Sequence, residues 1–207
     1  MSVSRLTQRY IEEHPSIKDC VQKDLINYSA LARQICNFHK IKRFEAVLIA
    51  CRRYFWKSKI NDSHEKKIID LIKGSKMHIK NKIIVAILER PRDMESLYLL
   101  QKKIRKEKGD LNIIEGEDVL TLITNSKYKE TIETALKPRV IKINDNLVQI
   151  TLIFDEKIEV TSGVVSYIYS LLSDNGINIR EEMSCWTDLM IILEEKDMAM
   201  AMEVLNF

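Results

Sequence analysis

Residues 147–193 read LVQITLIFDEKIEVTSGVVSYIYSLLSDNGINIREEMSCWTDLMIIL, and this stretch decides the fold. It begins with an apolar run of strand length, LVQITLIF, which a loop connects to a helical pattern of apolar residues. The helix ends at Asn175-Gly176, a combination typical of helix C-termini. The alternating INIREEM and the apolar WTDLMIIL then predict two further strands.

The same order of elements occurs once before in the chain. The patterns predict strands at 82–88, 111–114, 119–124 and 139–143, and helices over 93–106 and 127–136. This β-α-β-β-α-β order is the ferredoxin-like split βαβ arrangement, and it repeats at an offset of about 65 residues. The second copy ends in a helix that contains Met198, Met202 and Leu205. We therefore expect the second copy to lack its last strand, and Asn144-Asp145-Asn146 to form a hairpin turn between the copies. Either strand 139–143 serves both sheets or a second subunit covers the open edge.

The first 80 residues have a different period. Apolar residues at helical spacing predict helices over 3–12, 28–37, 44–56 and 64–73, with Asn27 as an N-cap. Several short helices in this length are compatible with a helix-turn-helix domain. The expected fold is α+β: a small all-α, helix-turn-helix-like domain followed by two ferredoxin-like modules. The expected domains are 1–76, 77–143 and 144–207.

Charge separates the same two parts of the chain. Residues 1–80 contain 17 Lys and Arg against 8 Asp and Glu, whereas residues 81–207 contain 16 against 22. A basic domain attracts polyanions such as double-stranded DNA. The candidate nucleic-acid-binding residues are Lys40, Lys42, Arg43, Arg52, Arg53 and Lys57. A solvated helical surface, or a helical domain for dimerisation or docking, explains the same charges.

Several classes of protein are not indicated. The apolar runs are short and bounded by charge, and no signal peptide is evident, so we expect a cytoplasmic protein without a membrane segment. Four scattered cysteines without a CxxC pair predict neither a disulfide scaffold nor a metal site. No phosphate-binding loop, HExxH or GxSxG motif is present. We expect a protein that is not an enzyme and needs no cofactor.

Two motifs in the second copy resemble those of the ACT domain, a small-molecule sensor of amino-acid metabolism. Thr161-Ser162-Gly163-Val164 stands at the strand-to-helix loop, where the family has Pro-Gly-Val or Pro-Gly-Ala, and Gly176-Ile177-Asn178-Ile179 matches the family's later motif in full. Ser162 replaces the usual proline. The first copy matches in the order of its elements only, with Asp93-Met94 in place of Gly-Val and Leu111-Asn112-Ile113 as a trace of the later motif. The tandem is similar to the regulatory modules of aspartate kinases, without a kinase domain.

The resemblance implies a ligand site in the second copy, formed by Thr161, Ser162, Gly163, Val164, Asn178 and Ile179. Gly163 has no side chain, so a ligand carboxylate can approach the backbone at the N-terminus of the following helix. Asn178 can hydrogen-bond to the ligand, and Arg180, Glu181 and Glu182 would lie near it. Such sites usually lie between two modules, which implies a homo-oligomer, a dimer or a tetramer.

Three functions are compatible with these features. The first is an amino-acid-responsive regulator of transcription, in which the ACT-like module senses an effector and the basic helices bind DNA. The second is a regulatory subunit that docks on an enzyme of amino-acid biosynthesis. The third is an assembly protein that has lost its ligand.

Overall fold

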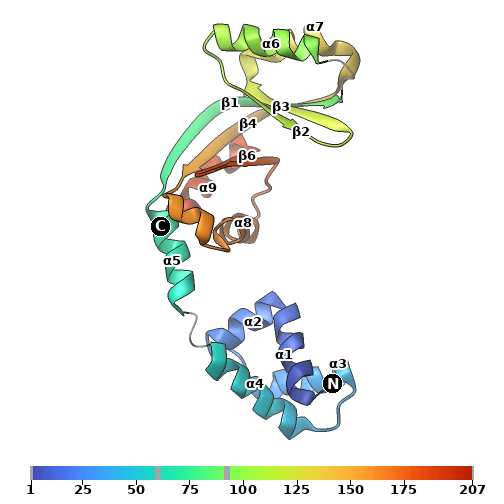
Figure 1. Ribbon diagram of the computed structural model, residues 1–207, viewed down its shortest axis with the longest axis vertical. Helices are drawn as coiled ribbons and strands as arrows, with labels where there is room; N and C mark the ends of the chain where they lie inside the picture. Colours follow the sequence, from blue (N-terminus) through green and yellow to red (C-terminus); the bar gives the residue numbers. More distant parts are fainter. Residues whose placement is uncertain (1, 59–61, 91–93, 207) are drawn as a thin grey trace. The chain divides into compact units, whose positions relative to one another are not determined.

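A computed structural model of the chain describes residues 2–58, 62–90 and 94–206, and Figure 1 labels its elements. The chain divides into two units, residues 1–66 and 67–207. None of the helices in these described ranges combines the length and the hydrophobicity that crossing a bilayer requires.

The first unit consists of short helices around one apolar core. Its helices are α1 (Val3–Glu13), α2 (Pro15–Gln22), α3 (Tyr28–His39) and α4 (Phe44–Ser58). The predicted N-cap is confirmed, because Asn27 Oδ1 accepts a hydrogen bond from Ala30 N at 3.0 Å. Helices α1 and α3 both pack against α4, and Ile11, Ile35 and Cys51 are fully buried between them. Helix α5 (Asp62–Lys73) crosses the boundary between the units.

The second unit is built on one antiparallel sheet in the order β2-β3-β1-β4-β6-β5. The strands are β1 (Lys76–Glu89), β2 (Leu111–Glu115), β3 (Val119–Asn125), β4 (Val140–Ile153), β5 (Glu181–Cys185) and β6 (Asp188–Glu194). The helices are α6 (Glu95–Lys106), α7 (Lys129–Leu136), α8 (Val164–Asp174) and α9 (Met198–Leu205), with short 3-10 turns η2 (Ser126–Tyr128), η3 (Lys137–Arg139), η4 (Glu156–Val160) and η5 (Glu195–Asp197). The mixed α+β class is therefore confirmed.

The first module contains every element of the split βαβ arrangement. It uses residues 83–89 of β1, then α6, β2, β3, α7 and residues 140–144 of β4, in the spatial order β2-β3-β1-β4. The side chains of Ile84, Leu122 and Ile132 are fully buried between its strands and helices. Strand and helix therefore follow each other in this module as the sequence predicts.

The second module differs from the sequence prediction in three ways. The alternating INIREEM predicts a strand over 177–183, but β5 spans Glu181–Cys185, so Ile177 and Ile179 precede it. The predicted hairpin at residues 144–146 is wrong, because β4 continues through these residues. The place of the last strand is not empty: residues 76–80 of β1 fill it, and Ile79 pairs with Ile150 of β4. The sequence does alternate here, with Met77 and Ile79 directed toward the apolar core between lysines and a histidine. The strand was missed because its partner lies far away in the sequence.

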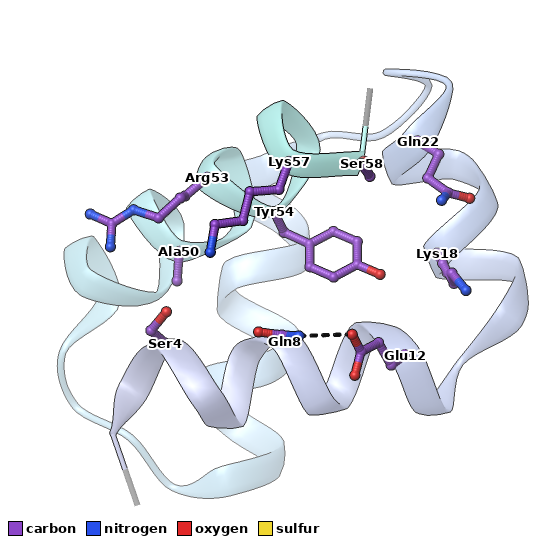
Figure 2. Close-up of a pocket in the computed structure, with 10 residues that line it drawn as sticks. All are labelled: Ser4, Gln8, Glu12, Lys18, Gln22, Ala50, Arg53, Tyr54, Lys57 and Ser58. Atoms are coloured by element: carbon purple, nitrogen blue, oxygen red, sulfur yellow. Dashed lines mark hydrogen bonds between the residues drawn. The ribbon is translucent and has the colours of Figure 1, made fainter. Parts of the chain in front are cut away.

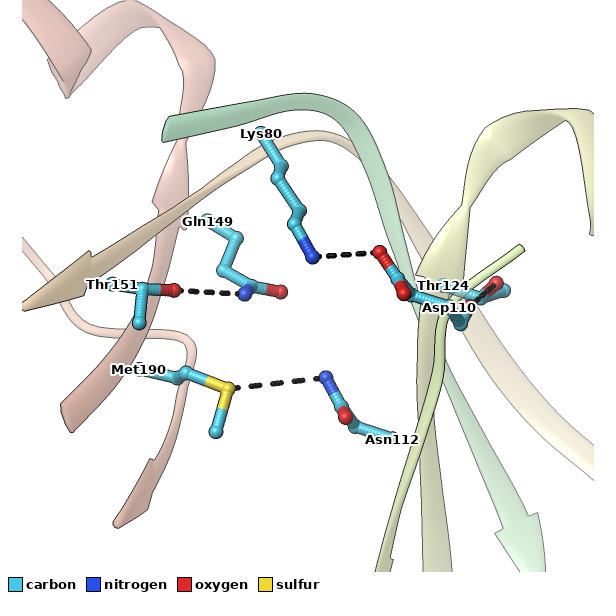
Figure 3. A network of polar contacts seen from close by, with 7 residues as sticks. All are labelled: Lys80, Asp110, Asn112, Thr124, Gln149, Thr151 and Met190. Atoms are coloured by element: carbon cyan, nitrogen blue, oxygen red, sulfur yellow. Dashed lines mark hydrogen bonds and ion pairs between the residues drawn. The ribbon is translucent and has the colours of Figure 1, made fainter. Parts of the chain in front are cut away.

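The sheet folds at the middle of its two long strands. The pairing of β1 with β4 shifts register between Lys80 and Ile83, and Lys82 and Asn146 have φ angles of 57° and 55°. Beyond this point the helix-free faces of the two modules meet. Asn112 on β2 donates to Met190 Sδ on β6 at 4.0 Å, although the two strands are not neighbours in the sheet (Figure 3).

Apolar and polar side chains fill the space between these faces. Residues Ile83, Val85, Ile123, Leu147 and Ile192 form an apolar cluster there. Around it, Lys80 pairs with Asp110 at 2.6 Å, and the buried Gln149 donates to Thr151 Oγ1 at 3.0 Å (Figure 3). The two modules thus share both their strands and a common core.

Candidate functional site

The loop that leads into α8 is held by its own hydrogen bonds. Asp155 Oδ1 accepts from Lys157 N at 3.0 Å, and Thr161 Oγ1 donates to the Lys157 carbonyl at 2.8 Å. Gly163 has a φ of 88°, a conformation that suits glycine, and its carbonyl accepts the first helical hydrogen bond from Tyr167 N at 2.9 Å. Val164 is 1% exposed and belongs to the core. Of the four loop residues, Val164 therefore presents no side chain to a ligand.

Helix α5 covers one side of this loop. A Cβ atom at Gly163 would lie 3.3 Å from Ile68 Cδ1, which is closer than ordinary van der Waals contact. Ile68 is itself buried in the same core as Val164 and Ile168. On this side, a side chain of α5 occupies the space that the missing side chain of Gly163 leaves open.

The other two predicted residues lie in a groove along α8. Asn178 is exposed and Ile179 is half-buried. The groove has a volume of about 600 Å³ and is lined by Val165, Ser166, Tyr169, Ser170, Ser173, Ile177, Asn178 and Ile179. Residues 161–164 are not part of this lining. The structure therefore brings together Asn178 and Ile179 with α8, in a groove that the loop before that helix does not line.

Charged groups border the groove on the side of β5. The Tyr169 hydroxyl donates to Glu182 Oε2 at 2.6 Å, and burial, followed by this bond, raises the pKa of Tyr169. Burial and the adjacent Glu182 raise the pKa of Glu181. Arg180 forms an ion pair with Glu194. Two of the three predicted neighbours of a ligand are thus already engaged, Arg180 with Glu194 and Glu182 with Tyr169. Glu181 forms no ion pair among the described residues and has the like charge of Glu182 beside it.

The groove offers hydroxyl and amide groups beside an apolar wall. Ser166, Ser170, Ser173 and Asn178 supply donors and acceptors, while Val165 and Ile179 supply apolar contact. Sequence reasoning missed the serines and Tyr169. Their signal is present, because Ser166, Tyr169 and Ser173 recur at helical spacing on the face opposite the buried Ile168 and Leu172.

The structure divides the candidate nucleic-acid-binding residues among three places. All six are exposed, and none of them takes part in an ion pair among the described residues. Arg53 and Lys57 line a groove between α1, α2 and α4 (Figure 2), whereas Arg52 projects from another face of α4 together with the exposed Ile49 and Trp56. The remaining three, Lys40, Lys42 and Arg43, belong to the loop between α3 and α4.

Metal-binding and reactive groups are sparse in the part of the chain that the structure describes. There, no three His, Cys, Asp or Glu side chains come close enough together to hold a metal ion. All four cysteines are free thiols. Burial raises the pKa of the Cys51 thiol to about 12, so Cys51 behaves as a small apolar side chain.

Solved structures share the fold of about two thirds of the chain. An aspartate kinase from Clostridium acetobutylicum matches with a TM-score of 0.53 and 16% identity, over 63% of this chain and 33% of that enzyme. The aspartokinase alpha and beta subunits match with a TM-score of 0.54 and 14% identity, over 66% of this chain and 96% of that one. The ligand-free regulatory subunit of aspartate kinase from Thermus thermophilus matches with a TM-score of 0.51 and 9% identity, over 65% and 97%.

These matches concern structure alone, since the sequence itself matches no family model and no curated protein. The chain spans about a third of the length of the Clostridium enzyme and nearly all of the separate regulatory subunit. The share of this chain that matches is close to the share formed by residues 67–207. The predicted ACT-like fold is confirmed at this level, and the helix-turn-helix character of the first unit stays a prediction. About two thirds of the chain share the fold of the regulatory subunit of aspartate kinase.

Proposed function

We propose that the chain is a non-catalytic regulatory protein whose second ACT-like module binds a small effector, an amino acid. The observation that carries the proposal is the groove in which Asn178 and Ile179 lie beside α8. Hydroxyl and amide groups suit the polar atoms of an amino acid, and the apolar wall suits its side chain. The fold supports the same role, because regulatory subunits of aspartate kinases share it.

Helix α5 offers a route for the signal. It begins before the boundary between the units, and Ile68 and Ile72 near its end are buried in the core that α8 also enters. Ile68 contacts the loop at Gly163, directly before α8. An effector that favours one position of α8 therefore also favours one position of α5, and such coupling between sites is typically worth about 1–3 kcal/mol.

A thermal-melt screen of the full chain against the standard amino acids, each at millimolar concentration, tests the proposal. A ligand at about 100 times its Kd adds about 2.7 kcal/mol to the free energy of unfolding. For a chain of this length we expect Tm to rise by roughly 5–10 °C. Asn178→Ala should abolish the rise, whereas Asn37→Ala, an exposed change on α3, should preserve it. If no amino acid raises Tm, the assembly function replaces the sensor function.

The basic helices receive the signal in this proposal, and DNA is the second candidate partner. Residues 25–61 contain eight Lys and Arg and a single carboxylate, Glu45, whereas residues 1–24 have four of each sign. Double-stranded DNA would bind such a surface with an affinity that falls steeply with salt. A docking role on a biosynthetic enzyme would instead show as co-purification with that enzyme. The modules would also self-associate as a dimer or tetramer, which light scattering can measure.

A further inference from the structure

The helical unit contains a groove of its own, between α1, α2 and α4 (Figure 2). It has a volume of about 300 Å³. Its lining consists of Ser4, Gln8, Glu12, Lys18, Gln22, Ala50, Arg53, Tyr54, Lys57 and Ser58. The groove lies in a different unit from the effector groove along α8, so it calls for a separate explanation.

The charge in this groove is not balanced. The lining contains three cations, Lys18, Arg53 and Lys57, but a single carboxylate, Glu12. Glu12 already accepts a hydrogen bond from Gln8 Nε2 at 2.9 Å. Within the described ranges, none of these three cations forms an ion pair. Two nearby cations do: Arg9 pairs with Glu13 at 2.6 Å, and Lys23 with Asp19 at 3.0 Å. The groove therefore has an excess of positive charge.

Three hydrogen-bond donors of the groove lie on one side of α4. Ala50, Arg53, Tyr54 and Lys57 recur at spacings of three and four residues and so share one side of the helix. Figure 2 shows Tyr54 and Lys57 reaching from α4 toward α1. Burial and the neighbouring Glu12 raise the pKa of Tyr54, so its hydroxyl stays protonated and can donate.

From these observations we propose that the groove binds a small molecule that carries a phosphate or a comparable doubly charged oxyanion. The guanidinium group and two ammonium groups match such an anion in charge. The hydroxyl and amide groups of Ser4, Gln8 and Gln22 supply neutral donors around it. A volume of about 300 Å³ is at the lower end for ligand pockets, which suits a metabolite with one charged group and no polymer.

Titration of the full-length protein with inorganic phosphate and with pyrophosphate tests the assignment. The readouts are backbone amide NMR shifts and Tm, with sodium chloride at matched ionic strength as the reference. We expect saturable shifts confined to α1, α2 and the second half of α4, with pyrophosphate binding more tightly than phosphate. The double variant Arg53→Gln/Lys57→Gln should raise Kd by about tenfold or more, because it removes two of the three cations.

A charge-matched variant makes the result specific. Arg33→Gln/Lys137→Gln also removes two exposed cations, neither of which lines the groove, and should leave Kd within about twofold. All four positions are exposed, so circular dichroism should show the same fold for both variants. Shifts that do not saturate, shifts spread over the whole surface, or equal weakening in both variants would each overturn the proposal. So would a short DNA duplex that binds through the same residues and displaces pyrophosphate.

Discussion

The two ACT-like modules have the same spatial order of strands. They differ in which segment of the chain forms the last strand, the one that pairs with the first strand of the module. In the first module, residues 140–144 fill this place after α7, in the usual order along the chain. In the second module, residues 76–80 fill it, although they precede the whole first module in the sequence. Because β1 and β4 each run through both modules, neither module has a complete sheet without the other. The pair should therefore unfold as one unit.

Substitutions in the two cores should change the free energy of unfolding most, and they test whether the two modules unfold together. Ile84 and Ile150 are each fully buried in the core of their module, with 0% of the residue exposed to solvent. Replacing either by Ala should lower the free energy of unfolding by about 2–5 kcal/mol, because it removes buried methyl groups and leaves a cavity. Shared strands predict that Ile150→Ala speeds amide exchange in β3 of the first module as much as in β6 of the second.

Hydrogen exchange measured by mass spectrometry checks this outcome strand by strand. Ile49→Ala is the matched control, because Ile49 is 55% exposed on α4 of the other unit and should leave exchange in the sheet unchanged. Faster exchange in one module alone would show that the shared strands do not couple the two.

Two glycines after the first helix of each module sharpen the comparison. A Cβ atom at Gly109 would collide with the Tyr128 hydroxyl and lie 2.7 Å from Tyr128 Cε2, while one at Gly176 would meet nothing within 4 Å. Gly109→Ala should therefore cost about 1–3 kcal/mol through overpacking, since Tyr128 is only 2% exposed. Gly176→Ala should cost about 1–2 kcal/mol, from its φ of 72° alone.

Urea unfolding of both variants separates crowding from backbone strain. Among the described residues, the buried Tyr128 hydroxyl has no hydrogen-bond partner, so Tyr128→Phe should be nearly neutral on its own. Added to Gly109→Ala, it should recover part of the loss, because it removes the atom in closest conflict. Added to Gly176→Ala, it should recover nothing.

The local elements of both modules could be predicted from the sequence, and the long-range pairing could not. Apolar periodicity found α6, α7 and α8 because their signals lie within one or two turns. The strand at residues 76–80 is amphipathic and short, and only its pairing with β4 identifies it. Asn146 favours a turn in the sequence, yet its left-handed conformation serves a bend inside a strand.

The residues of the candidate site likewise fall into those that a sequence motif could locate and those that only the packing of distant elements brings in. The Gly-Ile-Asn-Ile motif located Asn178 and Ile179, which do line a groove. The rest of that groove comes from α8, and the contact of Ile68 with Gly163 comes from α5, a helix far away in the sequence. Neither contribution can be recognised without knowing which elements pack together.

Asn112 and Asn178 show what the two modules do with related motifs. Asn112 faces Met190 Sδ across the core between the modules, whereas Asn178 is exposed at the groove. Asn112→Ala should reduce the free energy of unfolding by about 0.5–1 kcal/mol and leave any Tm shift by the effector intact. Asn178→Ala should change unfolding by less than about 0.5 kcal/mol and abolish the shift. Melts with and without the effector distinguish the two, and a reversed pattern would place the effector between the modules.

The smallest expected effect concerns the edge strands, where corresponding carboxylates have different neighbours. Glu181 on β5 is half-buried beside Glu182, and burial and the charge of Glu182 both raise its pKa. Glu115 on β2 instead forms an ion pair, with its Oε2 atom 3.6 Å from Arg90 Nη2. A carboxyl group with a raised pKa in the folded state favours folding at low pH, and this contribution is lost as pH rises through the raised value. Glu181→Gln should therefore increase the free energy of unfolding at pH 7, by less than about 1 kcal/mol because the carboxyl keeps contact with water.

The pH dependence of Tm for three variants checks the sign. The gain from Glu181→Gln should disappear below about pH 4, where the carboxyl is protonated in both states. Glu115→Gln should give no gain at pH 7, since it removes an ion pair with Arg90. Glu182→Gln should give a smaller gain than Glu181→Gln, because it removes the same repulsion but weakens the hydrogen bond from Tyr169. A gain from Glu115→Gln as large as that from Glu181→Gln would mean that the two edges do not differ, and that net charge, not the like-charged neighbour of Glu181, sets the effect.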